Sequence, residues 1–327
     1  MPSGGDTSSI GPRREQRARR RRRWQSSLIL GAVVALLVGG TAFAVTGPLQ
    51  HDDHGRTTRP GAAGAPATWS TAEKSCRAPL HPDDPLRLWI GGDSLAGSLG
   101  PALGELTGKS GVVQPVLDSR VSSGLLSRDF VNWPKLGGED MTLYNPEVVV
   151  FIIGANDAKN IPEAAPRDPR WRAQYSELVE EMLTILGANG RTVYWIGAPV
   201  MADAKHSARV QGVNDVFQEV VAKHPEVTYI DAYSLFSSPG GTFAATLPVP
   251  GGGVARVRAA DGIHFTPEGG DLIAGSLFER LDPACRITEQ AVRGEVKPTI
   301  EAKGSSSVPG SRRGMSTATT RGAGTGG

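Results

Sequence analysis

The sequence predicts an α/β fold: a three-layer α/β/α sandwich with a central parallel sheet. Between Cys76 and Cys285, short apolar runs alternate with longer amphipathic stretches, which is the pattern of parallel strands joined by helices. The run 148–153 is continuously apolar, as expected for a strand that is buried on both faces. No internal repeat divides this region, so we expect a single domain of roughly 200 residues.

Each element of this domain has its own signal in the sequence. Strands are expected where short apolar runs end in polar turns, and helices where apolar residues recur every three or four positions. Pro267 suits the first turn of the last helix. The expected strands are 86–90, 148–153, 192–196 and 227–231. The expected helices are 95–106, 171–185, 210–221 and 267–281.

The basic character of the chain is confined to its beginning. Residues 1–27 form a predicted cytoplasmic tail, in which eight arginines stand against Asp6 and Glu15. These charges give the tail a net charge of +6, and because the whole chain is +2, the remainder is −4. The body is therefore not basic, and a nucleic-acid partner is not expected.

Residues 28–45 are apolar or small except for Thr41, and they predict a transmembrane signal-anchor. As a helix they would rise about 27 Å, marginally enough to cross a hydrocarbon core. The preceding arginines would keep the tail in the cytoplasm and place the rest outside, as a single-pass membrane protein. The alternative is a cleaved signal peptide ending at Ala42-Phe43-Ala44, which would make the protein secreted.

The composition on both sides of the domain is typical of solvated segments. Residues 46–75 are rich in Gly, Ala, Pro and Thr, which predicts a linker. His51 and His54 there could bind a metal ion adventitiously, but a solvated linker is favoured. Residues 288–327, which end in a Gly/Ser/Thr-rich stretch, are expected to be a disordered tail.

Only two cysteines occur, and they bracket the predicted domain, 76–287. Outside the membrane their thiols would be in an oxidising space, where disulfides form and persist. We therefore expect a disulfide between Cys76 and Cys285, with two free buried thiols as the alternative.

Three polar blocks lie where the strands of such a sheet end or where the last helix begins. Ligands of open parallel sheets bind outside the carboxyl ends of the strands, so these blocks are the first candidates for chemistry. They are Gly91-Gly92-Asp93-Ser94-Leu95, Gly154-Ala155-Asn156-Asp157 and Asp261-Gly262-Ile263-His264.

Each block can also be explained by a structural role alone. Ser94 could cap the helix that follows it, and Asn156 with Asp157 could simply close a turn. The Asp-x-x-His block alone is weak, since such a histidine is often a loop or capping residue. Together the blocks could supply a serine nucleophile, a histidine base oriented by Asp261, and an amide donor to an oxyanion.

These blocks occur in the order found in the SGNH (GDSL-like) hydrolases, and the chain resembles that family over residues 86–281. Gly92 to Leu95 match its Gly-Asp-Ser-Leu block, Gly154 to Asp157 its Gly-x-Asn-Asp block, and Asp261 to His264 its Asp-x-x-His block. The family's further block is a glycine after the second strand, for which Gly124 is the best match. The resemblance implies a flavodoxin-like SGNH hydrolase fold.

The resemblance also implies roles for these residues. Ser94 would attack the acyl carbon, His264 would act as general base and then general acid, and Asp261 would orient His264. The backbone amides of Ser94 and Gly124 and the side-chain amide of Asn156 would form the oxyanion hole. Asp93 is expected to support its loop and Asp157 to organise its turn, and neither a cofactor nor a metal is required.

The expected substrate is an acyl ester, O-acetyl or another short chain, and a domain outside the membrane would meet such esters on envelope polysaccharides. The loop 236–258, together with Asn132, Trp133 and Met201, could shape the acyl or sugar pocket, with a plain surface loop as the alternative. Two other functions stay open. The acyl group could be transferred to a glycan instead of water, or the domain could be a non-catalytic envelope-assembly protein.

Overall fold

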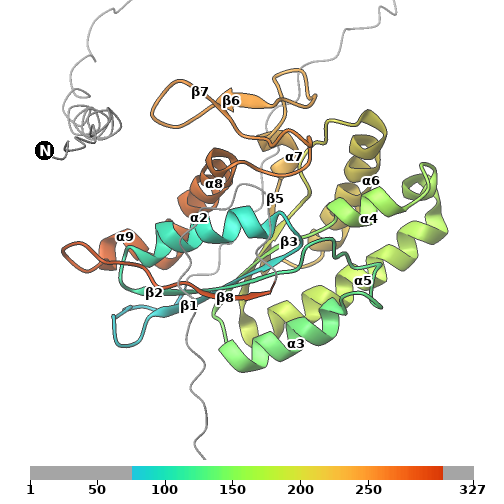
Figure 1. Ribbon diagram of the computed structural model, residues 1–327. Coiled ribbons are helices and arrows are strands. Elements are labelled where there is room, and N and C mark those ends of the chain that lie inside the picture. Colours follow the sequence, from blue (N-terminus) through green and yellow to red (C-terminus); the bar gives the residue numbers. More distant parts are fainter. Residues whose placement is uncertain (1–75, 305–327) are drawn as a thin grey trace, which may run out of the picture. The chain divides into compact units, whose positions relative to one another are not determined.

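A six-stranded parallel sheet lies at the centre of the computed structural model, which describes residues 76–304 (Figure 1). Its order is β5-β4-β3-β1-β2-β8, and every neighbouring pair is parallel. The strands are β1 Leu86–Gly92, β2 Val113–Ser119, β3 Val148–Ile152, β4 Thr192–Ile196, β5 Val227–Ile230 and β8 Glu301–Gly304. The predicted fold class is confirmed. Because β1 lies between β2 and β3, the strand order reverses there, which is where ligand crevices of such sheets form.

Helices cover both faces of this sheet (Figure 1). On one face α2, Ala96–Gly108, packs against α8, Pro267–Cys285. The other face is covered by α3 Trp133–Tyr144, α5 Pro169–Gly187 and α6 Ala204–Val221. The shorter elements are α4 Ala155–Asn160, α7 Ala232–Leu235, α9 Ile287–Gln290 and the antiparallel pair β6 Thr246–Pro248 and β7 Val254–Arg256.

Aromatic side chains fill the space between the sheet and the α3, α5 and α6 layer. Phe151 on β3 has its ring centroid 5.2 Å from that of Trp133 on α3 and 5.2 Å from that of Trp195 on β4, both edge to face. Trp195 continues in the same way to Phe217 on α6. All four side chains are fully buried, and rings of this size contribute much of the apolar area that folding removes from water.

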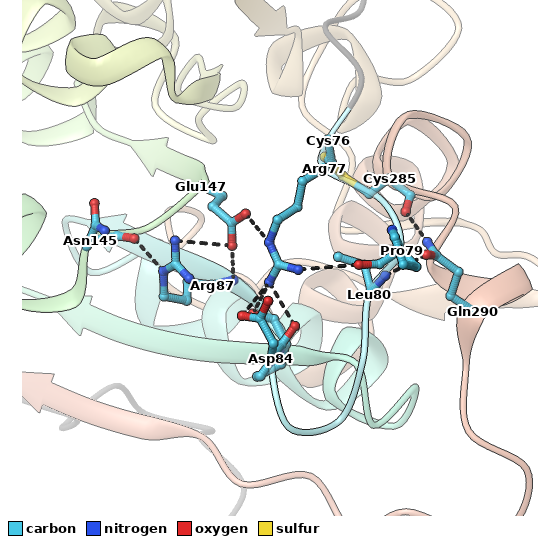
Figure 2. Close-up of polar contacts among 11 residues, drawn as sticks. Cys76, Arg77, Pro79, Leu80, Asp84, Arg87, Asn145, Glu147, Cys285 and Gln290 are labelled. Carbon is cyan, nitrogen blue, oxygen red and sulfur yellow. Dashed lines mark hydrogen bonds and ion pairs between the residues drawn. A yellow bond between two sulfur atoms is a disulfide. The ribbon is translucent and has the colours of Figure 1, made fainter.

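The first described residues are joined to the end of α8 and to the sheet (Figure 2). Cys76 forms the predicted disulfide with Cys285, at a separation of 209 residues. The next residue, Arg77, donates to Glu147 Oε1 at 2.6 Å and to the carbonyl oxygen of Asp84 at 2.8 Å. These contacts hold the entry into the domain near the amino ends of β1 and β3.

The expectation of a disordered segment from residue 288 is wrong for 288–304. These residues include the end of α9 and then β8, which pairs with β2 from Val116 to Ser119. Ile300 packs over Gly104 of α2, and Lys303 donates to the buried Asp140 at 2.7 Å. The segment is ordered because it covers part of α2 and adds a strand to the edge of the sheet.

Several predicted segments lie outside the described residues, namely the tail 1–27, the anchor 28–45, the linker 46–75 and residues 305–327. Within residues 76–304, no helix is long and apolar enough to span a membrane.

Candidate active site

Ser94 lies in the turn between β1 and α2, at the carboxyl end of the central strand. The N-cap position of α2 is Leu95, and no side chain caps this helix. The alternative that Ser94 is a helix cap therefore does not hold. Its hydroxyl lies instead 2.9 Å from Nε2 of His264, which comes from the loop before α8, 170 residues along the chain.

The second ring nitrogen of His264 faces Asp261. Nδ1 lies 2.7 Å from Asp261 Oδ2, and Oδ1 of the same carboxylate accepts from the amides of Ile263 at 2.9 Å and His264 at 3.0 Å. The structure thus brings Ser94, His264 and Asp261 together in one hydrogen-bonded chain. Gly262 has a φ of 70°, and a side chain there would collide with Ala202, so the loop requires glycine at this position.

The protonation state of Asp261 determines the tautomer of the histidine. Partial burial raises the pKa of this carboxyl, but hydrogen bonds from the His264 side chain and from the His264 and Ile263 amides outweigh it and lower the pKa to about 2. At neutral pH the group is a carboxylate and can only accept hydrogen bonds. Nδ1 of the neutral ring must therefore carry the proton, which leaves Nε2 free to accept the proton of Ser94.

The predicted oxyanion donors lie on three neighbouring segments. Asn156, at the start of α4, donates from Nδ2 to the carbonyl oxygen of Ser123 at 2.9 Å. This hydrogen bond fixes the amide group of Asn156, and the second N–H of Nδ2 remains able to donate to an oxyanion. Ser123 directly precedes Gly124. Among the described residues, the backbone amides of Ser94 and Gly124 donate to no protein acceptor. These three donors are the set that the resemblance implies for a developing oxyanion.

Asp157 anchors the loop that carries Gly124. Its fully buried carboxylate accepts from the amides of Leu125 at 3.0 Å and Leu126 at 2.9 Å, and from the hydroxyl of Tyr175 at 2.9 Å. Burial raises the pKa of this group, and these three donors oppose the rise. A Cβ on Gly124 would lie against Asp157 Oδ1. Asp157 was expected to organise its own turn, whereas these contacts show that its side chain holds the loop of Gly124.

Asp93 is the other buried acid of the site. Its side chain has no exposed surface, Oδ1 accepts from the Leu95 amide at 2.9 Å, and Oδ2 has no partner among the described residues. Burial raises the pKa of Asp93 to about 7, the Leu95 amide opposes the rise, and the charge of Asp157 adds to it. Asp93 therefore supports the turn before α2, as expected.

Two of the other residues expected near a pocket, Trp133 and Met201, belong to the core. Trp133 is fully buried and donates from its indole to the hydroxyl of Ser123 at 3.0 Å, and Met201 is almost fully buried. Asn132 caps α3 by accepting from the Lys135 amide at 3.0 Å. Trp133 and Met201 are therefore buried and do not form a substrate surface, whereas Asn132 is exposed at the start of α3.

Three side chains that support the site were not predicted for this role from the sequence. Tyr175 holds Asp157, and it was expected only as part of an apolar helix face. His206 on α6 is buried, and its Nε2 lies 2.9 Å from the carbonyl oxygen of Ala155 at the start of α4. Arg258 is fully buried beneath the Asp261 loop. Two arginines, Arg256 and Arg258, closely precede the Asp-x-x-His block, and nothing in the sequence marks Arg258 as the buried one.

No cluster of three or more His, Cys, Asp or Glu side chains able to hold a metal ion occurs within residues 76–304. His51 and His54 lie outside the described residues.

A family model described as "Protein of unknown function (DUF459)" matches residues 87–280, which span every block of the site. No curated protein matches the chain.

Solved structures similar to this chain include a putative acylhydrolase from Bacteroides fragilis, with 17% identity and a TM-score of 0.44 over 60% of this chain and 86% of that one. A GDSL-like lipase from Bacteroides thetaiotaomicron has 15% identity and a TM-score of 0.44 over 61% and 88% of the two chains. A catalytic mutant of an acetylxylan esterase from Geobacillus stearothermophilus has 13% identity and a TM-score of 0.46 over 60% and 94%.

Proposed function

The chain belongs to the family described as "Protein of unknown function (DUF459)", and from this premise we propose that it is an SGNH-type serine esterase that hydrolyses short-chain acyl esters outside the cytoplasmic membrane. The observation that carries the proposal is the hydrogen-bonded chain from Ser94 Oγ through His264 to Asp261. A serine hydroxyl needs a base within hydrogen-bond reach to become a nucleophile, and that base needs a partner that orients it.

In the first half of the reaction, Ser94 Oγ forms a bond to the acyl carbon while its proton passes to Nε2 of His264. The imidazolium that results is stabilised by the Asp261 carboxylate, 2.7 Å from Nδ1. The negative charge moves to the former carbonyl oxygen, where the amides of Ser94, Gly124 and Asn156 can donate.

The tetrahedral intermediate then collapses and breaks the bond to the alcohol, which takes the proton from His264. A water molecule repeats the sequence on the acyl-serine: His264 removes its proton, the same donors hold the oxyanion, and the carboxylic acid leaves as Ser94 recovers its proton. Every proton transfer is made by one ring nitrogen, which is consistent with the single contact between His264 and Ser94.

The proposed substrates are O-acetyl or similar short-chain esters on cell-envelope glycans. Two features support a location outside the membrane: the arginine-rich tail followed by the apolar segment 28–45, and the Cys76–Cys285 disulfide, a bond that is typical of exported proteins. Envelope glycans carry the esters that a domain tethered there would meet.

The test is hydrolysis of p-nitrophenyl acetate and of an O-acetylated polysaccharide by the full-length chain. We expect Ser94→Ala to lower kcat by about 1000-fold or more, because the nucleophile is lost. The matched control is Ser98→Ala, which removes another hydroxyl close by on α2. Equal rates for the wild type and Ser94→Ala would refute the proposal, whereas product formed only on an added glycan acceptor would show transfer instead of hydrolysis.

A further inference from the structure

Arg258 is a charged side chain with no exposed surface, next to the loop that carries Asp261 and His264. Its Nη1 donates to the carbonyl oxygen of Val200 at 2.5 Å, on the segment that follows β4. Its Nη2 donates to the carbonyl oxygens of Ile263 at 2.8 Å and Gly262 at 3.4 Å. The guanidinium therefore joins the loop of Asp261 and His264 to the segment that follows β4.

Three phenylalanine rings enclose this guanidinium. Its Cζ lies 5.6 Å from the ring centroid of Phe236, 5.2 Å from that of Phe243 and 5.6 Å from that of Phe265. Among the described residues Arg258 forms no salt bridge, so its charge is held by ring faces and carbonyl dipoles. Burial lowers the pKa of Arg258 to about 10 and the charge of Asp261 opposes this, so the group remains a cation at neutral pH.

A buried cation without a carboxylate in contact is costly for a fold to keep, and an apolar side chain of similar size would fill the same space. What an apolar side chain could not do is donate hydrogen bonds to Gly262 and Ile263. These two carbonyls belong to the peptides between Asp261 and His264.

The same two peptides hold Asp261 from their other side. The N–H of Ile263 and the N–H of His264 both donate to Asp261 Oδ1, at 2.9 and 3.0 Å. In a trans peptide the C=O and N–H groups point in opposite directions, and both of these peptides are trans. Arg258 holds the Ile263 carbonyl at 2.8 Å and shares the Gly262 carbonyl with the Ala202 amide, which donates to it at 3.1 Å. When the carbonyls are held on one side, the amides on the other side are directed at the carboxylate.

We propose that Arg258 is a positioning residue of the base system, which acts through the Gly262 and Ile263 peptides to orient the Asp261 carboxylate and with it the ring of His264. The role rests on the proposed esterase function, because it concerns the geometry of the same base. Arg258 itself contacts neither Ser94 nor His264 side-chain atoms in the structure.

Arg258→Met tests this role, because methionine fills a similar volume and donates no hydrogen bond. The first readout is the pKa of Asp261, measured by NMR on full-length protein carrying ¹³C-carboxyl aspartate and Ser94→Ala, with Asp261→Asn to assign the signal. We expect Arg258→Met to raise this pKa from about 2 toward 3.8, because the two amides no longer converge on the carboxylate. In the Ser94-containing chain, kcat should fall about 10- to 100-fold with little change in KM.

Arg191→Met is the matched control. Arg191 is also buried and also donates to three main-chain carbonyls, those of Pro146, Ala188 and Met141, but it directly precedes β4 and so lies at the amino end of that strand. If Arg258 only stabilised the fold, Arg258→Met and Arg191→Met would have the same effect on the pKa of Asp261 and on kcat. Our proposal predicts that Arg191→Met lowers thermal stability and leaves the pKa of Asp261 and kcat unchanged.

Arg258→Lys keeps the charge and one donor group, so it tests the proposal even if Arg258→Met does not fold. We expect its values of kcat and of the Asp261 pKa to lie between those of the wild type and of the methionine variant. An Asp261 pKa of about 2 in a folded Arg258 variant would overturn the proposal. Since the NMR measurement is made on Ser94→Ala protein, it decides this role even if the wild type hydrolyses no ester.

Discussion

The buried carboxyl of Asp93 makes the stability of this domain depend on pH in a direction that is unusual for an aspartate. Its side chain has no exposed surface, and burial raises its pKa from 3.8 to about 7, against the hydrogen bond from the Leu95 amide. The folded state therefore prefers the protonated acid. In Asp93→Asn, the side-chain oxygen still accepts from Leu95, but the group no longer titrates.

The direction of this pH dependence follows from the number of protons that the folded and the unfolded states bind. Between pH 3.8 and about 7 the folded protein keeps a proton that the unfolded chain has released, so the free energy of unfolding falls as pH rises and levels off above about 7. At ~1.4 kcal/mol for each pKa unit, the whole fall is about 4 kcal/mol. Asp157 lies close enough to raise the pKa of Asp93, so Asp93→Asn also relieves a repulsion between the two acids.

Urea unfolding of the wild type and of Asp93→Asn, from about pH 4 to about pH 8, measures this effect. We expect the free energy of unfolding of Asp93→Asn, minus that of the wild type, to increase by about 4 kcal/mol from the low to the high end of that range. This expectation does not depend on how much the two free energies differ at low pH. Asp129→Asn, a change at an exposed aspartate, is the control and should run parallel to the wild type. Parallel curves for Asp93→Asn and the wild type would refute the reasoning.

Three further predictions concern the loop of Gly124 and the ends of the domain. Gly124→Ala should lower kcat by about 100- to 1000-fold in ester hydrolysis, because the added Cβ would push the loop away from Asp157 and displace one oxyanion donor. An unchanged kcat would exclude Gly124 from the oxyanion hole. Tyr175→Phe should lower the free energy of urea unfolding by about 1.5 to 3 kcal/mol, because it removes a hydrogen bond to a buried carboxylate, and no loss would contradict the role given to Asp157. The double variant Cys76→Ser and Cys285→Ser should be less stable to urea by about 5 kcal/mol on the loop-closure model, since the bond closes a loop with a separation of 209 residues, and equal stability would contradict this.

The strands that could be predicted from the sequence are those with continuous apolar runs. The expected strands 86–90, 148–153, 192–196 and 227–231 correspond to β1, β3, β4 and β5. No range could be assigned to β2, because Pro115 and Asp118 interrupt its apolar pattern. Asp118 is nonetheless fully buried, since Arg120 pairs with it at 2.6 Å.

The last strand, β8, could not be predicted for a different reason. Its four residues, Glu301–Gly304, have no apolar alternation, and they form a strand only because β2 offers an unpaired edge. Such pairing depends on main-chain groups and on contacts like that of Lys303 with Asp140, which are distant in sequence.

The residues of the candidate site likewise divide into those that could be predicted from local sequence and those that could not. Ser94, Asp261 and His264 were predicted because their chemistry is carried by side chains in recognisable blocks, and the structure brings these three side chains into one hydrogen-bonded chain. Arg258 acts through main-chain carbonyls and Tyr175 through a residue of another segment. Roles of that kind become visible only when the segments are placed together.

Trapping of an acyl-enzyme tests most directly whether Ser94 is a nucleophile. The full-length chain would be mixed with p-nitrophenyl acetate, quenched in acid at early times, digested and analysed by mass spectrometry. We expect one acetyl group on Ser94 in the wild type and none in His264→Ala, whose serine lacks a base 2.9 Å from Oγ. If the wild type hydrolyses the ester and no acetyl group is found on Ser94, that result would contradict the account.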